Sequence, residues 1–203
     1  SAVSVSGAED YLGTGILASS TKDAPLPMAS ISKVITALVV LQAKPLGSSG
    51  TGPVIHFTRA ETELYEKYFK LNATIAPMPI GTTMSEYAAL ETMLVPSACN
   101  YAEALADWAY GSDGAFITAT NAYLKAHRLS HTTMLEPTGL DDRNKSTPQD
   151  LIAIGKLAMA SPAIGKIVGK VNVAAIPSLS GFSNTNDVLN QDGVNGIKTG
   201  TLD

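Results

Sequence analysis

Hydrophobic residues follow a helical period in one early segment and alternate with polar residues near the N-terminus. Apolar residues after Ser30 recur at spacings of three and four, which predicts a buried helix. They are Ile31, Val34, Ile35, Leu38 and Val39. Residues 2–6 and 13–17 alternate and are rich in valine and glycine, with the turn-forming residues 7–10 between them. These two stretches predict a β-hairpin ahead of the helix.

The middle of the chain carries several helix start signals after a loop at residues 44–53 that is rich in glycine, serine and proline. Thr58 with Glu61, and Thr83 with Glu86, fit the capping-box pattern and predict two helices. The second of these must stop near Pro96. Further helices are expected at residues 98–109, at residues 114–127 and after the Thr147–Pro148 pair, where proline suits the first helical position.

Strand-like segments return at residues 170–176 and 194–201. Strands at both ends around a helical middle predict an α+β fold. We expect a sheet subdomain formed by residues 1–43 and 166–203, and a mostly helical subdomain formed by residues 44–165. The active site would lie between them.

Composition excludes several classes of function. The chain has 203 residues, 14 Lys and Arg against 18 Asp and Glu, and a net charge of −4. No basic cluster is present, which argues against nucleic-acid binding. The longest apolar run, residues 34–41, is far shorter than the roughly 20 residues of a membrane span. A single Cys excludes an internal disulfide and a cysteine-rich metal site, and we expect neither a metal nor a cofactor.

Ser30 and Lys33 form the first candidate reactive pair. Residues three apart on a helix are neighbours, so the lysine could take the proton of the serine hydroxyl once burial lowers its pKa. The S-x-x-K pattern alone is weak, because Ser19 and Lys22 match it too. A plain N-cap is the alternative for Ser30.

Two further motifs carry polar chemistry. Lys198, Thr199, Gly200 and Thr201 place an ammonium and hydroxyls where they could hold a carboxylate, and the glycine permits close backbone approach. Ser97 follows Pro96 at a helix start and could relay a proton, although an N-cap again is the alternative.

Taken in order, these motifs resemble those of the penicillin-recognising serine enzymes, S-x-x-K, S-x-N and K-[TS]-G. Separations of 67 residues from Ser30 to Ser97 and 101 residues from Ser97 to Lys198 are similar to those of that family. Residues 27–38, 93–100 and 196–201 look like the corresponding motif regions of the low-molecular-weight D-alanyl-D-alanine carboxypeptidases. Residues 137–141, 146–151 and 184–186 are also similar to stretches of that group. The resemblance implies a β-lactamase/DD-peptidase-like antiparallel sheet flanked by helices.

The resemblance also implies roles for the motif residues. Ser30 would attack the carbonyl of a D-Ala-D-Ala peptide bond, Lys33 would be the base, and Ser97 would pass the proton to the leaving D-alanine. Substrate would bind Thr199, Gly200 and Thr201, with Lys198 supplying positive charge. Backbone N–H groups of Ser30 and Thr201 would form the oxyanion hole.

Two departures from the family pattern affect these expectations. Cys99 stands where the second motif has asparagine, and Asn100 is one residue out of register, so we count both as candidate substrate-binding residues. The chain also stops at Asp203, soon after the third motif, whereas the family fold continues. We therefore expect either a fragment or a chain whose fold is completed by a separate C-terminal segment.

The implied partners are a peptidoglycan stem peptide ending in D-Ala-D-Ala and β-lactams as covalent inhibitors, in a bacterial cell envelope outside the cytoplasm. Two alternatives remain. A β-lactamase shares the motifs, and Glu136 with Pro137 faintly resembles its deacylating loop, but only 11 residues separate Glu136 from Thr147. A non-catalytic envelope protein that binds muropeptides or β-lactams is the other.

Overall fold

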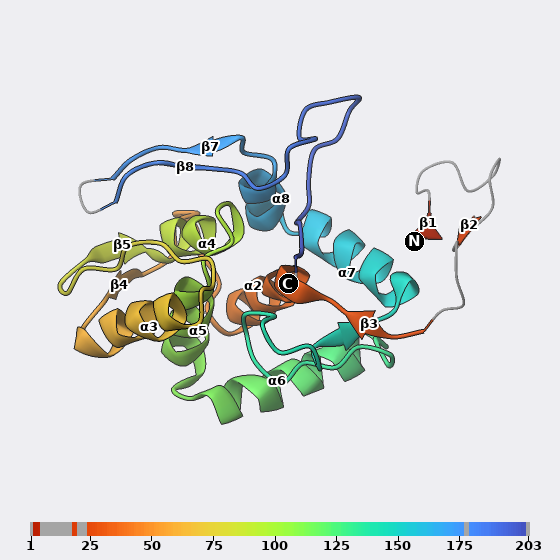
Figure 1. The fold of residues 1–203 in the computed structure, drawn as a ribbon, viewed down its shortest axis with the longest axis horizontal. Coiled ribbons are helices and arrows are strands. Elements are labelled where there is room, and N and C mark those ends of the chain that lie inside the picture. The colour runs from red at the N-terminus through yellow and green to blue at the C-terminus, as the bar shows by residue number, and fades with distance from the viewer. Residues whose placement is uncertain (1, 5–17, 20–23, 177–178, 202–203) are drawn as a thin grey trace.

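The computed structural model describes residues 2–4, 18–19, 24–176 and 179–201. Helices dominate it, and its strands form short antiparallel pairs (Figure 1). The helices are the 3-10 helix η1 (Ala29–Ile31), α2 (Ser32–Ala43), α3 (Arg59–Lys70), α4 (Glu86–Leu94), α5 (Cys99–Tyr110), α6 (Asp113–Ala126), α7 (Pro148–Ala160) and α8 (Pro162–Val168).

The described strands pair in four separate two-stranded sheets, all antiparallel. The pairs are β1 (Ala2–Val3) with β2 (Ala18–Ser19), β3 (Leu26–Pro27) with β6 (Lys145–Ser146), β4 (Val54–His56) with β5 (Thr83–Ser85), and β7 (Asn172–Val173) with β8 (Phe182–Ser183). The α+β class is thus confirmed. The division into subdomains at residues 44 and 165 stays a prediction.

Helix α2 occupies the centre of the core and packs against α4, α5, α6 and α7. Residues 32–40 are all buried, so the helix is enclosed on every side rather than along one stripe. A helix that is apolar all round belongs inside a protein. Burial of each large apolar side chain here, such as Ile35, stabilises the fold by roughly 1.5–3 kcal/mol.

Most of the predicted helices are confirmed close to their expected ends. Thr58 and Glu61 form the predicted capping box at the start of α3, and Thr147 caps α7 by accepting a hydrogen bond from the backbone N–H of Asp150. Helix α4 ends at Leu94, just ahead of Pro96 as expected.

The predicted capping box of Thr83 and Glu86 is wrong. Thr83 pairs with His56 in the β4–β5 ladder, so helix α4 begins two residues later than a Thr83 cap requires. Ser85 is the N-cap instead, and its hydroxyl accepts a hydrogen bond from the backbone N–H of Ala88. Both Thr83 and Ser85 are residue types that can cap a helix, and the strand pairing of Thr83 leaves Ser85 as the cap.

The strand predictions are only partly confirmed. Of residues 170–176, β7 covers only Asn172–Val173, with a further bridge between Ile176 and Leu179. Residues 194–201 form no strand, because none of the residues that the structure describes makes a ladder with them. The turn of the predicted N-terminal hairpin, and its second strand at 13–17, lie outside the described residues; β1 and β2 on either side are antiparallel.

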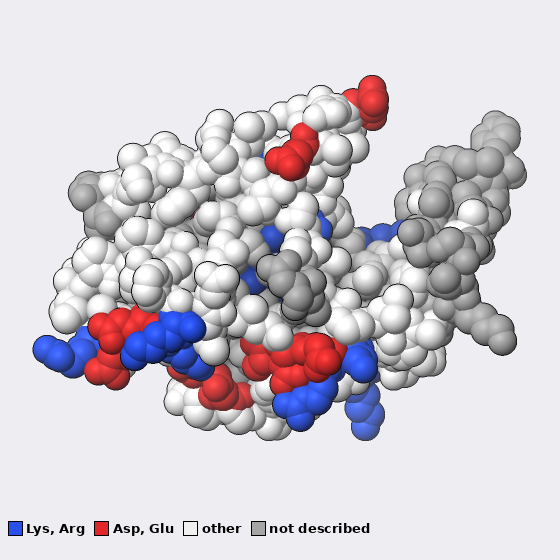
Figure 2. Space-filling view, viewed as in Figure 1, with Lys and Arg blue, Asp and Glu red and all other residues white. Residues whose placement is uncertain are grey.

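No single described helix is long and apolar enough to span a membrane; α7 and α8 pass that test only as a pair, and they meet at a bend of 103°. Charged side chains gather along one edge of the molecule, over α3 and α6 (Figure 2). The C-terminal segment crosses above α7 and descends onto the start of α2 (Figure 1).

Candidate active site

Ser30 lies in η1, whose backbone continues directly into α2, and Lys33 follows in the first turn of α2. The amine of Lys33 donates a hydrogen bond to Ser30 Oγ over 3.0 Å. Ser30 is not the N-cap of α2, since Ile31 holds that position and no side chain caps the helix. The structure therefore brings the predicted pair together.

The backbone just before Ser30 is strained. Ala29 has a φ of 50°, in the left-handed region that residues other than glycine rarely adopt. Its carbonyl lies against Gly139, where an added Cβ would stand only 1.9 Å from Ala29 O. Gly139 itself has a φ of 88°. Both this backbone conformation and the lack of space for a Cβ therefore require glycine at this position. Strain of this kind persists only where the surrounding structure fixes it, and it clusters at functional sites.

Lys33 is completely buried. Besides Ser30, its amine donates to the carbonyl oxygen of Thr138 at 2.7 Å and to Cys99 Sγ at 3.4 Å. Burial lowers the pKa of Lys33, while Cys99 and Glu136 act in the opposite direction. A neutral amine can accept a proton, so the site holds a base in contact with a serine hydroxyl.

Ser97 and Cys99 come from the junction of α4 and α5. Ser97 is almost completely buried, has a φ of 71°, and its Oγ has no hydrogen-bond partner among the described residues. Ala98, not Ser97, is the N-cap of α5. The free hydroxyl therefore has no capping role, and a buried hydroxyl without a partner is costly unless a ligand or water meets it.

Asn100 does not present its amide to the reactive cluster. It is fully buried, its Oδ1 accepts from the N–H of Ala76 at 3.1 Å, and its Nδ2 donates to Ala76 O at 2.9 Å. Both halves of the amide are used to fix a neighbouring loop. A substrate contact of Asn100 stays a prediction that these hydrogen bonds do not support, and Cys99 is the residue that contacts Lys33.

The third motif lies along the start of α2. A Cβ added to Gly200 would stand 2.8 Å from Met28 O and 3.3 Å from the Cβ of Ala29, so the chain passes close to its own backbone here; the approach of a substrate backbone stays a prediction. Lys198 Nζ donates to Thr199 O at 3.1 Å and to Thr185 Oγ1 at 3.5 Å. Thr201 is exposed.

The three motifs interact electrostatically. Burial, followed by the positive charge of Lys33, lowers the pKa of Lys198 to about 8, and Cys99 opposes this. Two lysines that influence each other across the cluster favour the neutral form of at least one of them. One amine can then serve as a base while the other stays cationic.

Residues 137–141 and 184–186 resemble stretches of the family, but the sequence predicts no role in this cluster for Thr138 or Thr185. Thr185, whose hydroxyl lies 2.7 Å from that of Thr199, supports the third motif. Thr138 supplies the carbonyl that binds Lys33, and Asn144 is fully buried. A contact made by a main-chain carbonyl cannot be recognised from the sequence, because every residue type has this group. The proline and glycine flanking Thr138 were the only local signal of a fixed turn.

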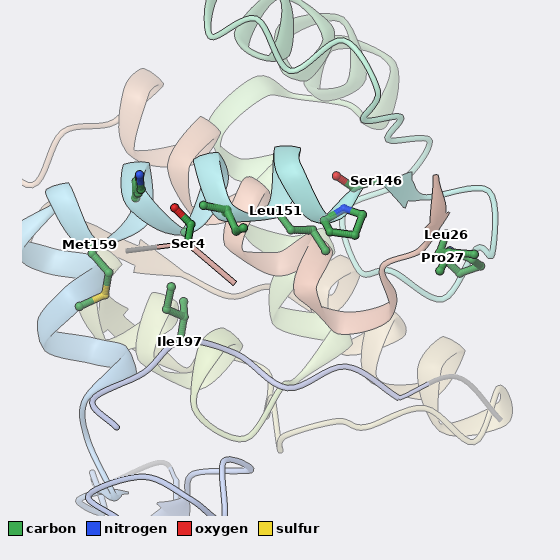
Figure 3. A pocket seen from close by; sticks show the side chains of 11 residues that line it. Ser4, Leu26, Pro27, Ser146, Leu151, Met159 and Ile197 are labelled. Carbon is green, nitrogen blue, oxygen red and sulfur yellow. The ribbon is translucent and has the colours of Figure 1, made fainter. Parts of the chain in front are cut away.

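Two cavities adjoin the third motif. One of about 320 Å³ has Ile31, Ile154 and Lys198 among its lining residues. A larger one, of about 820 Å³, runs along α7 and is mostly apolar, with Leu151, Met159 and Ile197 turned toward it (Figure 3). Lys198 lines the smaller cavity, and Ile197, the residue before it, lines both.

A group of carboxylates on α5 and α6 was not expected, since no metal site was predicted. Ligand atoms of Glu103, Asp107 and Asp113 all lie within 4.8 Å of one another. Glu103 is already paired with Lys67 and accepts a hydrogen bond from Tyr68. Burial and the neighbouring carboxylates raise the pKa of Asp107 to about 6, as expected for acidic groups crowded together.

Several known proteins are similar to this chain in fold or in sequence. The crystal structure of the Streptomyces K15 DD-transpeptidase superimposes with a TM-score of 0.80 at 26% identity, covering 93% of this chain and 76% of that one. A D-alanyl-D-alanine carboxypeptidase from Mycobacterium tuberculosis shares the fold, with a TM-score of 0.78 over 93% of this chain and 69% of that one, at 24% identity.

Curated relatives are similar in sequence. A D-alanyl-D-alanine endopeptidase from Pseudomonas aeruginosa is 30% identical over 180 residues, which is 86% of this chain and 54% of the relative. The D-alanyl-D-alanine carboxypeptidase DacA from Escherichia coli is 26% identical over 96% of this chain and 48% of its own length. This chain thus spans about half the length of these relatives. The sequence model of peptidase S11, D-alanyl-D-alanine carboxypeptidase, matches residues 8–203, and the protein belongs to that family.

Proposed function

We propose that this protein is a serine DD-peptidase that removes the terminal D-alanine from peptidoglycan stem peptides ending in D-Ala-D-Ala. The observation that carries the proposal is the hydrogen bond from the buried amine of Lys33 to Ser30 Oγ. A serine hydroxyl becomes an effective nucleophile when an adjacent base takes its proton. Membership of the S11 family supports the choice of substrate.

In the proposed acylation step, Lys33 accepts the proton of Ser30 and the serine oxygen attacks the carbonyl of the D-Ala-D-Ala bond. The N–H groups of Ser30 and Thr201 stabilise the oxyanion, a contribution of roughly 3 kcal/mol per donor. The C–N bond then breaks, leaving an acyl ester on Ser30. Water hydrolyses this ester and regenerates the serine.

Ser97 is the proposed relay between Lys33 and the leaving D-alanine. Its buried hydroxyl has no hydrogen-bond partner among the described residues, so it is available both to donate to the leaving amine and to accept from a lysine. Lys198, with the hydroxyls of Thr199 and Thr201, binds the terminal carboxylate of the substrate. Cys99 borders the same space through its contact with Lys33.

One observation argues against a β-lactamase. Deacylation there would require the Glu136 carboxylate to activate a water molecule, yet both of its oxygens accept short hydrogen bonds from its own loop. Its oxygens are therefore occupied by donors of the loop, which leaves little acceptor capacity for a water molecule. We also propose that the protein works in the cell envelope, outside the cytoplasm, because its proposed substrate lies there.

The test measures product release from a stem pentapeptide ending in D-Ala-D-Ala, beside a cross-linked dimer of stem peptides. Released D-alanine from the pentapeptide, abolished by Ser30→Ala, is expected. Cleavage of the dimer without release of D-alanine would instead assign an endopeptidase. Exclusive transfer to an added amino acceptor would assign a transpeptidase. Binding of the peptide without any turnover would overturn an enzymatic role.

A further inference from the structure

A loop at residues 136–144 forms the wall behind Ser30 and Lys33, and it is organised around one carboxylate. Glu136 Oε2 accepts from the N–H and the hydroxyl of Thr138, each at 2.6 Å. Oε1 accepts from the N–H of Gly139 at 2.6 Å and from Asn144 Nδ2 at 2.9 Å, with a longer contact to the N–H of Asp141 at 3.4 Å. The side chain of Glu136 thus fixes the turn at 136–139.

This turn determines what Lys33 meets. With its N–H and hydroxyl both bound to Glu136, Thr138 directs its carbonyl oxygen to Lys33 Nζ at 2.7 Å. Immediately before it, Pro137 O accepts from the hydroxyl of Thr36 at 2.7 Å, which ties the same turn to the next turn of α2. Gly139, immediately after it, packs against Ala29 O.

Asn144 closes the loop onto the segment that carries Ser30. Its backbone carbonyl accepts from the N–H of Met28 at 2.9 Å, and its Nδ2 donates to Ser32 Oγ at 3.3 Å. The same Nδ2 donates to Glu136 Oε1. Residues on both sides of Ser30 are therefore held by groups that Glu136 orders.

We propose that Glu136 is a positioning residue for Lys33, because its carboxylate fixes the Thr138 carbonyl that binds the amine and places a negative charge near that amine. This inference deepens the proposed function, on which it rests for the role of Lys33 as base. Glu136 itself takes no part in the proposed reaction, because both of its oxygens accept hydrogen bonds from groups of the loop.

Within the part of the chain that the structure describes, three charged or titratable groups face Lys33. They are Cys99 on α5, Glu136 in the loop and Lys198 in the third motif. Glu136 raises the pKa of Lys33 against the larger opposing effect of burial. Removing that negative charge must therefore lower the pH at which Lys33 becomes neutral and can act as a base.

The experiment follows the second-order rate constant of acylation by penicillin as a function of pH in Glu136→Gln and Glu136→Asp. Gln removes the charge and sets an amide N–H₂ against backbone donors; Asp keeps the charge but is one methylene too short. Both should slow acylation by about 10- to 100-fold, because the base is displaced. Only Gln should move the acidic limb of the profile, downward by about one pH unit.

Asp141→Asn is the matched control, since it removes one negative charge from the same loop at a carboxylate that binds only Arg143 among the described groups. It should leave the acidic limb in place. An unmoved limb in Glu136→Gln, or an equal shift in Asp141→Asn, would overturn the inference. If Glu136→Gln does not fold, an unchanged acylation rate in Glu136→Asp would overturn it instead.

A second readout needs no substrate. In protein labelled with ¹³C-lysine, the Lys33 Cε resonance is assigned by its loss in Lys33→Arg and titrated with pH. Its midpoint should be lower in Glu136→Gln than in the parent and unchanged in Asp141→Asn. Equal midpoints in all three proteins would overturn the role of Glu136, even if the parent proves to have another substrate.

Discussion

At the scale of single residues, the site combines two amines whose pKa values are both lowered by burial. Lys33 is sealed inside the core and contacts Ser30, whereas Lys198 is partly exposed and contacts the hydroxyl of Thr185. Burial and the proximity of Lys33 bring the pKa of Lys198 to about 8. A cationic Lys198 therefore exists below about pH 8 and is lost above it.

Substitution of Lys198 by Arg should move the basic limb of penicillin acylation. In the parent, the rate should fall as pH rises through about 8, because the ammonium that attracts the carboxylate of the drug loses its proton. Arginine keeps its charge at any accessible pH, so in Lys198→Arg the rate should hold to at least one pH unit higher. Acylation rates measured across the pH range by stopped-flow provide the test.

Lys156→Arg, at an exposed position on α7, serves as the control and should leave the profile unchanged. A basic limb at the same pH in the parent and in Lys198→Arg would show that another group titrates there.

At the scale of elements, two glycines illustrate how the segment around Ser30 is held. Gly139 and Gly81 both have a positive φ, 88° and 80°, but only Gly139 is pressed against another backbone. An added methyl group at Gly81 would meet nothing within 4 Å. Substitutions at these two glycines therefore separate the stability lost through an unfavourable φ from the stability lost through a clash with Ala29.

Gly81→Ala should lower the free energy of unfolding by about 1 kcal/mol through its unfavourable φ alone. Gly139→Ala should cost roughly 3 kcal/mol or more, because its Cβ would displace Ala29 and with it Ser30. Urea denaturation of both variants measures the difference. Penicillin acylation should survive in Gly81→Ala and be lost in folded Gly139→Ala; equal stabilities would refute the clash.

Glu86, the first residue of α4, is a second element-scale feature. Its carboxyl is fully buried beneath the loop at residues 44–53, and neither oxygen has a hydrogen-bond partner among the described residues. Burial raises its pKa from 4.5 to about 7, against the opposing charge of Lys44. The folded protein then binds more protons than the unfolded chain between these values, so stability falls as pH rises through this range.

Glu86→Gln should remove this dependence, because the amide stays neutral. At pH 8 the variant should be more stable than the parent by about 1–3 kcal/mol, and near pH 4 the two should be similar. Thermal unfolding followed from pH 4 to pH 8 tests this, with the exposed Glu63→Gln on α3 as control. Parallel curves for the parent and Glu86→Gln would contradict the account.

Sequence patterns predicted elements best where the controlling interactions are local. The caps at Thr58 and Thr147 and the end of α4 before Pro96 depend on neighbours within a few residues, and all three are confirmed. The β4–β5 pairing joins segments about 30 residues apart, and it moved the start of α4 in a way that local pattern could not predict.

At the scale of the whole molecule, the site is assembled from segments distant in sequence around the start of α2. Ordered motifs predicted that Ser30, Lys33, Ser97 and Lys198 belong together, and the structure brings Lys33 to both Ser30 and Cys99. Residues 137–141 resemble a stretch of the family, but the supporting role of the loop at residues 136–144 was not predicted, because it acts through main-chain carbonyls and N–H groups. Such groups occur at every residue and only the fold selects which of them matter.

The central claim is that Ser30 is a nucleophile activated by Lys33. Intact-protein mass spectrometry after incubation with a labelled penicillin tests it most directly. The account predicts a stable adduct of one penicillin per chain in the parent and none in Ser30→Ala. An adduct of equal yield in Ser30→Ala, or a parent that leaves the drug intact and unbound, would contradict it.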